Sequence, residues 1–289
     1  MLKYRWRWLK EKYVAIKVNA IGQHPLQQKK PFDAEVRILE HISTTNPKHI
    51  GYPYVRKLID SFLLSGKTGT QSHQCLVFEP MREPLWLYQT RFEGDVVPPE
   101  ALKCQVHMIL KALDYLHSEC HVIHTDIKPD NIMVEFEDPT LPHRSAMEAR
   151  LHPLPQKSYR DPDSRIIYHS GNDFGDLVGA AGYVQLSDFD CAVQGDAKHP
   201  DVIQADIYRA PEVILEAGYS YSVDIWSLGV MLWDVIEGKR LFSAVDTHKG
   251  NEYDSINHLA LITALLGPPP EDLLHRGRRT DMLYDGKGK

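Results

Sequence analysis

A short polar stretch, His124–Asn131, carries side chains whose types and spacing suit the transfer of a negatively charged group. The carboxylate of Asp126 could accept the proton of a hydroxyl nucleophile. The amine of Lys128 could neutralise charge on a phosphoryl group, and the amide oxygen of Asn131 suits a hard cation such as Mg²⁺. A polar surface loop could show the same residues by chance. Other parts of the chain must therefore supply the remaining groups of such a site.

Two earlier stretches carry a lysine and a glutamate that could contribute to such a site. Tyr13–Val18 is rich in β-branched and apolar residues, which predicts a strand that carries Lys17. Apolar residues then recur at 32, 36, 39 and 42 with helical spacing, and Glu35 lies on this segment, 18 residues after Lys17. Glu35 is therefore one candidate partner for the amine of Lys17. A solvated helix glutamate is the alternative interpretation of Glu35, and Glu40 is the competing partner.

Length and composition limit the classes of protein that fit. The 289 residues suit one large or two modest domains, and 43% apolar with 25% charged residues is ordinary for a globular protein. Apolar runs stay well short of a membrane span, and the basic, aromatic start is unlike a signal peptide. Four isolated cysteines argue against a disulfide framework, and the net charge of −6 gives no general attraction to nucleic acid. We expect a monomer without a membrane or direct nucleic-acid partner.

The pattern of apolar and turn residues predicts the elements that position these side chains. Two strands, 54–64 and 74–78, flank a polar turn, and a long helix with proline in its first turn begins at Pro98. Its expected buried stripe comprises residues 102, 106, 109, 110, 113 and 116. Short strands are expected at Ile132–Val134 and Tyr183–Leu186. Between these strands, residues 136–181 lack periodicity apart from a short strand at 165–168, which indicates an insertion or a partly disordered loop.

Taken together, these motifs resemble those of the eukaryotic protein kinases over Tyr13–Leu266. His124–Asn131 reads H-x-D-x-K-P-x-N, like the kinase catalytic loop. Val14–Lys17 reads V-A-I-K, like the kinase strand whose lysine contacts the ATP phosphates, and Ala210–Glu212 reads A-P-E. Ser187–Asp190 stands where the D-F-G motif is expected.

Further details narrow the resemblance and mark its departures. Tyr208–Glu212 is typical of the CMGC group of kinases, and Thr125 stands where most kinases have Arg. With the insertion after Val134 and the segment 248–267, these features are similar to the SR-protein kinases, especially the fungal members. Asp190 replaces the glycine of D-F-G, which predicts a stiffer loop that still keeps its metal ligand.

The resemblance implies an α+β, two-lobed protein-kinase-like fold. Residues 1–81 would form a partial, β-rich N-lobe without the glycine-rich loop. Residues 82–289 would form a mainly helical C-lobe with an insertion at about 136–181 and an incomplete C-terminal end. We therefore expect a chain truncated at both ends. Loss of the first strands would expose a sheet edge and remove backbone N–H donors from the phosphates of a nucleotide.

The resemblance also implies roles for individual residues, with ATP and Mg²⁺ as cofactors. The residues implied in catalysis are Asp126, Lys128, Lys17 and Glu35, and the resemblance implies an ion pair in which Glu35 positions Lys17. The residues implied in ATP binding are Ala15, Lys17, Phe78, Glu79, Met81, Met133 and Asp188. The implied Mg²⁺ ligands are Asn131 and Asp188. The C=O of Glu79 and the N–H of Met81 would face the adenine, and Asp224 would tie the catalytic-loop backbone to the helix that carries it.

Three functions remain open from the sequence. The first is a serine/threonine protein kinase, in the cytoplasm, the nucleus or both, that transfers the γ-phosphate of ATP to Ser of a protein substrate, with Arg-Ser-rich segments as the candidate. The second is a truncated, weak or inactive kinase-like docking or scaffold protein, in which Glu252 and Asp254 could bind Arg-rich segments. The third is a small-molecule phosphotransferase, against which Ala210–Glu212 and Asp224 argue.

The residue before Asp126 bears on regulation. In kinases switched by phosphorylation, an Arg at this position binds the phosphate of the activation loop. Here the residue is Thr125, and residues 190–207 contain no Ser, Thr or Tyr. The arginine that would bind such a phosphate and the hydroxyl residues that would carry it are therefore both absent from these positions. The sequence therefore predicts activity that needs no phosphorylation of this segment.

Overall fold

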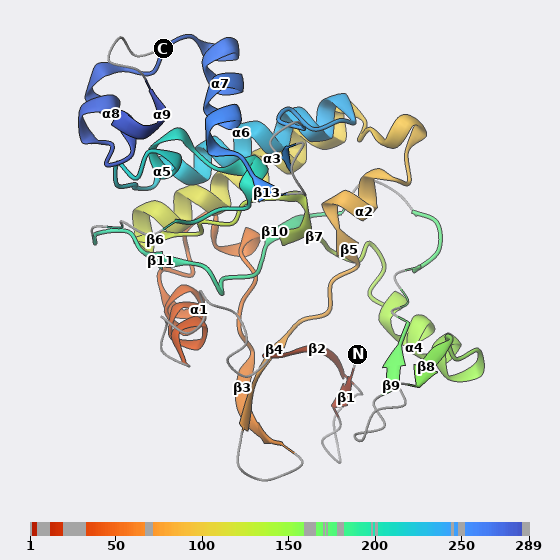
Figure 1. Cartoon of the computed structure of the whole chain (residues 1–289). Coiled ribbons are helices and arrows are strands. Elements are labelled where there is room, and N and C mark those ends of the chain that lie inside the picture. The colour runs from red at the N-terminus through yellow and green to blue at the C-terminus, as the bar shows by residue number, and fades with distance from the viewer. Residues whose placement is uncertain are drawn as a thin grey trace.

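The structure is a computed structural model, and it describes residues 2–4, 12–19, 33–66, 72–158, 166–169, 171, 173–177, 182–197, 199, 202–243, 246–247 and 252–284. A β-sheet with one neighbouring helix lies at one end, and a group of helices lies at the other (Figure 1). Short strands lie between the two, and the loops that join them contain the polar stretch 124–131 and Asp188. Residues 5–11, in the part of the N-lobe where the glycine-rich loop is expected to be absent, lie outside the described residues.

The sheet has the strand order β1-β2-β4-β3, and all of its pairs are antiparallel. Its strands are β1 (Leu2–Tyr4), β2 (Lys12–Val18), β3 (Asp60–Ser65) and β4 (Ser72–Phe78). The register places Lys17 opposite Leu76 and Ala15 opposite Phe78. The strand expected at 54–64 was too long, because β3 begins at Asp60. Tyr52–Tyr54 instead forms a 3₁₀ turn with Pro53, which has no N–H to give to a sheet ladder.

Helix α1 (Ala34–Thr44) follows the apolar spacing expected from the sequence. It buries Val36, Leu39 and Ile42 on one face, at positions three and four residues apart. Glu35 is also buried on this helix. Because α1 packs this face inward, it carries the Glu35 carboxylate toward the strand that holds Lys17.

The helical part is built on two long helices, α3 (Pro99–Asp114) and α6 (Ser222–Glu237). The smaller helices around them are α2 (Leu85–Gln89), α5 (Pro211–Ile214), α7 (Ser255–Leu266), α8 (Glu271–Arg276) and α9 (Thr280–Leu283). The expected buried stripe of α3 was right at Leu102, Ile109 and Leu113 but wrong at Leu110, which is 45% exposed. One residue further along a helix turns a side chain by about 100°, which carries Leu110 out of the core.

A three-stranded sheet and a two-stranded pair, all of short strands, link the first sheet to the helices. β7 (Ile132–Val134) pairs antiparallel with β10 (Val184–Leu186) and with β5 (Glu83–Pro84). β6 (Val122–Ile123) pairs with β11 (Val193–Gln194). The chain from β6 to β7 contains the polar stretch 124–131, and the chain from β10 to β11 contains Asp188. Strand pairing therefore brings these two loops together.

The segment after β7 contains a helix that the sequence did not reveal. The short strand expected near 165–168 is present as β9 (Ile166–Tyr168), which pairs with β8 (Gln156–Ser158). The expectation that the rest is irregular was wrong, because α4 spans Leu141–Leu151. Only Leu141 and Pro142 of this helix are buried, so it shows no apolar stripe that periodicity could detect. Figure 1 places α4, β8 and β9 beside the end of the sheet that carries β1 and β2.

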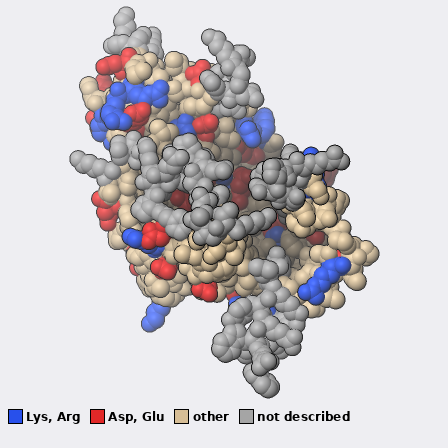
Figure 2. Space-filling model, turned by 60° about the horizontal axis from the view of Figure 1, so that its bottom comes forward, with Lys and Arg blue, Asp and Glu red and all other residues tan. Residues whose placement is uncertain are grey.

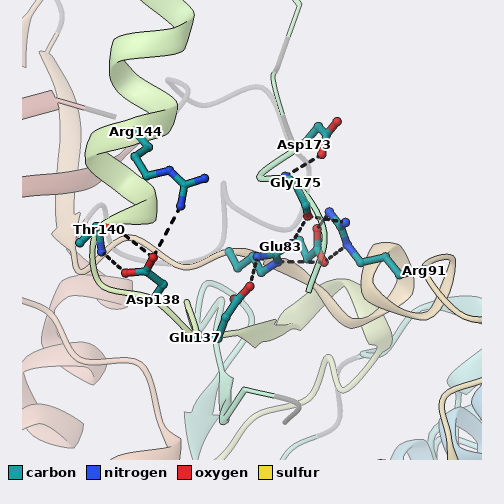
Figure 3. Close-up of polar contacts among 9 residues, drawn as sticks. Glu83, Arg91, Glu137, Asp138, Thr140, Arg144, Asp173 and Gly175 are labelled. Carbon is teal, nitrogen blue, oxygen red and sulfur yellow. Dashed lines mark hydrogen bonds and ion pairs between the residues drawn. The ribbon is translucent and has the colours of Figure 1, made fainter. Parts of the chain in front are cut away.

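A cluster of buried charges fixes the segment after β7 to the helical part (Figure 3). Arg82 Nη1 donates to Glu137 Oε1 at 2.6 Å, and Arg91 Nη2 donates to Glu83 Oε2 at 2.7 Å. Both arginines also donate to the carbonyl oxygen of Gly175. Arg82 and Glu83 are buried, and burial of charges is tolerable when they are paired and hydrogen-bonded. Both ends of the insertion are thus tied to the residues that follow β4.

The surface has mixed charge. On the face shown in Figure 2, Lys and Arg side chains alternate with Asp and Glu side chains among the coloured residues. In the part of the chain that the structure describes, no helix has the length and apolar character needed to cross a membrane.

Candidate active site

The ammonium of Lys17 lies between two carboxylates. Its Nζ donates to Glu35 Oε1 at 2.7 Å and to Asp188 Oδ1 at 2.6 Å. Asn19 Nδ2 donates to the other oxygen of Glu35, Oε2, at 3.0 Å. Glu40 is exposed, so Lys17 has the partner expected from the sequence and not the competitor. Three elements thus meet here: β2, α1 and the loop after β10.

The charges of the two candidate amines are stabilised by their partners. Burial disfavours the charge of Lys17, but Glu35 and Asp188 outweigh burial and raise the pKa of Lys17 above its ordinary value. Burial likewise disfavours the charge of Lys128, and the Asp126 carboxylate overcomes it and raises the pKa of Lys128. Both amines therefore stay protonated at neutral pH.

The polar stretch between β6 and β7 is internally hydrogen-bonded. Lys128 Nζ donates to Asp126 Oδ2 at 2.7 Å, and Asn131 Nδ2 donates to the same oxygen at 2.9 Å. Asn131 Nδ2 also donates to the Asp126 carbonyl oxygen at 2.8 Å. Among the described residues, these side-chain contacts use Oδ2 and leave Asp126 Oδ1 to accept from another group. The arrangement suits acceptance of a hydroxyl proton.

A buried carboxylate on α6 holds the backbone of this stretch. Asp224 Oδ2 accepts from the His124 N–H and Oδ1 accepts from the Thr125 N–H, each at 2.8 Å. His117 Nε2 donates to Asp224 Oδ2, also at 2.8 Å. Asp224 is fully buried, and Thr125 has a positive φ of 67°, which is uncommon for a β-branched residue. The two bonds from Asp224 hold the backbone in this conformation.

The loop that carries Asp188 is tied to the same stretch through His124. The Asp126 N–H donates to His124 Nδ1 at 3.2 Å, and His124 Nε2 donates to the Ser187 carbonyl at 3.0 Å. The Phe189 ring is buried against the His124 ring, with centroids 4.9 Å apart. Asp188 itself takes a positive φ of 67°, whereas Asp190 does not. Asp190 therefore adopts a conformation that needs no glycine.

Two adjoining cavities lie against these groups. A cavity of about 310 Å³ is lined by six of the expected residues, namely Ala15, Lys17, Glu35, Phe78, Asn131 and Asp188. A more open space of about 1640 Å³ is lined by Ala15, Met81 and Met133 together with residues of the insertion. Asp126 and Lys128 line neither space. They lie next to the smaller one, because Asn131, which lines it, donates a hydrogen bond to Asp126. The structure thus gathers the expected residues around one cleft.

Glu79 does not line the cleft as expected, and Arg56 lines it although the sequence did not indicate this residue. Glu79 lines neither cavity; its side chain pairs with Lys12, and its carbonyl accepts from Arg56 Nη2 at 3.1 Å. Arg56 lines both cavities. The available signal was a guanidinium directly after Val55 in the stretch 54–64 that was expected to form a strand, where a strand facing the core would carry apolar residues.

The residues present fit a hard divalent cation. Asn131 and Asp188 line the same cavity, and both offer oxygen atoms, which Mg²⁺ prefers. Because Asn131 Nδ2 is engaged by Asp126, the amide oxygen is the atom left to bind a cation. The described residues contain no group of three or more His, Cys, Asp or Glu side chains that could hold a metal alone.

Comparison with known proteins agrees with this geometry. The sequence model of the protein kinase domain matches residues 6–276. A serine/threonine protein kinase of Aspergillus fumigatus is 35% identical over 280 residues, covering 96% of this chain and 64% of that protein. The serine/threonine-protein kinase SRPK of Physarum polycephalum is 29% identical over 293 residues, covering 96% of this chain and 66% of that protein. The chain thus spans just under two thirds of the length of these relatives.

A solved structure gives the same result for the fold. A crystal structure of a kinase domain matches with a TM-score of 0.64 and 28% identity, covering 94% of this chain and 68% of the other. The α+β, two-lobed fold expected from the sequence is therefore confirmed, and so is the similarity to the SR-protein kinases. The chain belongs to the protein kinase family.

Proposed function

We propose that this chain is a serine/threonine protein kinase that transfers the γ-phosphate of ATP to a serine hydroxyl of a protein substrate. The observation that carries the proposal is the cleft in which Lys17, Glu35, Asp188 and Asn131 meet beside Asp126. Phosphoryl transfer depends mainly on positioning and on charge neutralisation. These side chains supply both.

Each group has a defined task in the proposed reaction. Asp126 Oδ1 accepts the proton of the attacking hydroxyl, and Lys128 neutralises charge on the phosphoryl group as it moves. Lys17, oriented by Glu35, contacts the α- and β-phosphates. Asn131 and Asp188 would hold Mg²⁺, which when bound would supply positive charge to the phosphate oxygens.

The proposed substrate is a protein segment rich in Arg and Ser. The proposal rests on the similarity to the SR-protein kinases, which the name of the Physarum polycephalum relative supports. A net charge of −6 is compatible with a basic substrate. Asp254 supplies less support than expected, because its carboxylate caps α7 by accepting from the N–H groups of Ile256 and Asn257. The Glu252 side chain lies outside the described residues.

A phosphoryl-transfer assay tests the proposal. The purified chain is incubated with γ-labelled ATP, Mg²⁺ and an Arg-Ser repeat peptide, beside an Asp126→Asn variant. We expect label on the Arg-Ser peptide and none on a peptide in which Ser is replaced by Ala. A Lys-Ser peptide shows whether arginine itself is recognised. Label no greater than that of the Asp126→Asn variant would refute the kinase proposal and leave a docking or scaffold function for this chain.

The contacts of Thr125 support activity without phosphorylation of the segment after Asp188. Thr125 Oγ1 donates to the carbonyl oxygen of Cys191 at 2.9 Å. This bond ties the loop directly to the catalytic stretch, at the position where an Arg would otherwise bind a phosphate. We propose that this contact takes over the ordering role of the phosphate.

Phosphatase treatment is therefore expected to leave the activity unchanged within about twofold. Complete removal of phosphate is checked by mass spectrometry, and the phosphatase is removed before the peptide assay. A Thr125→Val variant, which loses the hydroxyl, should be less active, whereas Thr125→Ser should keep most of the activity. If phosphatase abolishes the activity and a phosphosite maps to residues 188–212, the contact is not sufficient and the expectation is wrong.

Replacing Lys17 by Met should weaken the binding of ATP by about tenfold, the value of one charge-assisted hydrogen bond of roughly 1.5 kcal/mol. The change also leaves the buried Glu35 without its cationic partner, so some loss of stability is expected. Titration calorimetry with ATP and Mg²⁺ measures the affinity. Lys12→Met is the control. Lys12 lies on the same strand as Lys17, and its exposed amine pairs with Glu79. Equal affinities of the two variants would show that Lys17 does not contact the nucleotide.

A further inference from the structure

Arg56 lies at the junction of the two cavities of the cleft. It follows Val55, whose backbone is bridged to Leu186 at the end of β10. From there its guanidinium reaches over the Phe78 ring, 4.6 Å from the ring centroid. Arg56 and Ala15 are the two residues that line both the inner cavity with Lys17 and the outer cavity with Met81. The guanidinium therefore lies where the base of a bound nucleotide would sit.

The guanidinium occupies a backbone acceptor that a nucleotide would use. Arg56 Nη2 donates to the Glu79 carbonyl at 3.1 Å. In the proposed nucleotide site, this carbonyl faces the 6-amino group of adenine. An amine that approaches it must share the oxygen with Arg56 or displace the guanidinium. A purine with an oxygen at position 6 does not compete for this carbonyl, because its oxygen can accept from the N–H groups of the Arg56 guanidinium.

The guanidinium also has donor capacity to spare. Arg56 Nε is buried, and no acceptor within the described ranges lies within hydrogen-bond distance of it. Burial lowers the pKa of Arg56 to about 10, and Asp188 opposes this shift in part. Arg56 remains charged at neutral pH. A partly desolvated guanidinium with an unused N–H favours an acceptor on a ligand that enters the cleft.

We propose that Arg56 determines which purine the cleft prefers, by holding the Glu79 carbonyl and presenting N–H donors to position 6 of the base. This inference rests on the proposed nucleotide site and adds a residue that sets its specificity. In the wild-type chain the preference for a 6-amino purine over a 6-oxo purine is small. Removal of the guanidinium frees the carbonyl for the amine and takes away the donors that a 6-oxo group would use.

Binding of ATP and ITP to wild type and Arg56→Met tests the proposal. The two nucleotides carry the same charge, so the loss of a positive charge cancels in the ratio of their dissociation constants. The mismatch between N1–H of the 6-oxo purine and the Met81 N–H also cancels, because it is present in both proteins. Methionine keeps an apolar side chain over Phe78 and removes every donor. We expect Arg56→Met to raise the ratio Kd(ITP)/Kd(ATP) by about tenfold or more.

Controls separate this proposal from the proposed function. Arg144→Met removes a cation that lines the outer cavity and pairs with Asp138 rather than with Glu79, so the ratio should stay within twofold of wild type. If Arg56→Met fails to fold, Arg56→Gln is measured, and a rise in the ratio of about threefold is expected. An unchanged ratio in a folded Arg56 variant that still binds ATP overturns the role of Arg56 alone. If wild type and all variants bind neither nucleotide, the proposed kinase function fails, and this inference with it.

Discussion

Replacing Asp126 by Asn should lower the rate of phosphoryl transfer to a peptide by about 10²–10⁴-fold, the usual contribution of a general base. The variant keeps an oxygen at the position that accepts from Lys128 Nζ and Asn131 Nδ2, so the hydrogen bonds that orient the loop can persist. What is lost is the ability to take up a proton. Because Asp126 lines neither cavity of the cleft, nucleotide binding should change by less than about twofold.

Asp130→Asn is the matched control for this experiment. Asp130 lies four residues along the same stretch, is exposed and lines the cavity with Asn131, so the substitution removes the same charge close by. Initial rates with a labelled peptide give kcat and KM, and calorimetry gives the affinity for ATP. A large fall in kcat for Asp126→Asn with a change within about threefold for Asp130→Asn is expected. Similar losses for both would mean that charge near the cleft, and not proton acceptance by Asp126, sets the rate.

The residues of the cleft could be read from the sequence because each occupies a position in a short motif. Lys17 and Glu35 are 18 residues apart and lie on different elements, and the resemblance to the protein kinases implied the contact between them that the structure shows. The spacing within 124–131 likewise placed Asp126 beside Lys128 and Asn131, because residues so close in sequence can share one loop. Short sequence patterns therefore predict which side chains meet when those side chains lie close together in the chain.

The parts that the sequence did not reveal depend on contacts between distant segments. Helix α4 buries only its first two residues, so amphipathicity could not mark it, and Arg82 and Arg91 fix its segment through Glu137 and Gly175. The position of Arg56 against the Glu79 carbonyl depends on how Val55 meets Leu186, a pairing of residues far apart in the chain. Propensity and periodicity do not report such pairings.

The site also depends on backbone conformations that no motif specifies. Thr125 and Asp188 both take φ near +67°, where a side chain other than glycine is strained. Each is held by hydrogen bonds to the other loop or to α6: Thr125 by Asp224 and Cys191, and the Asp188 loop by His124. Strained residues persist only where surrounding contacts outweigh the strain. Substitution of Asp224, whose carboxylate holds the Thr125 backbone, therefore tests most directly whether these contacts keep the catalytic stretch in its conformation.

Asp224→Ala should lower the free energy of unfolding by about 3–5 kcal/mol, as expected when a buried, hydrogen-bonded charge is removed. The substitution leaves the N–H groups of His124 and Thr125 without their acceptor in the protein interior, and each such loss costs about 1–3 kcal/mol. Urea unfolding followed by circular dichroism measures the change. Phosphoryl transfer should be lost even at temperatures where the variant is folded, because the strained Thr125 backbone is no longer held.

Asp234→Asn separates the loss of stability from the loss of loop order. Asp234 lies further along α6, is also largely shielded from solvent, and accepts from the Leu241 N–H at 2.8 Å and from the Tyr208 hydroxyl at 3.0 Å. Its substitution should lower stability while keeping most of the activity below the unfolding transition, since Asp234 makes no bond to residues 124–131. Asp224→Asn, which retains one acceptor oxygen, should fall between wild type and Asp224→Ala in both measurements. If folded Asp224→Ala retained wild-type activity, the geometry of Asp126 would not depend on this anchor, and the catalytic stretch would have to be ordered by Lys128 and Asn131 alone.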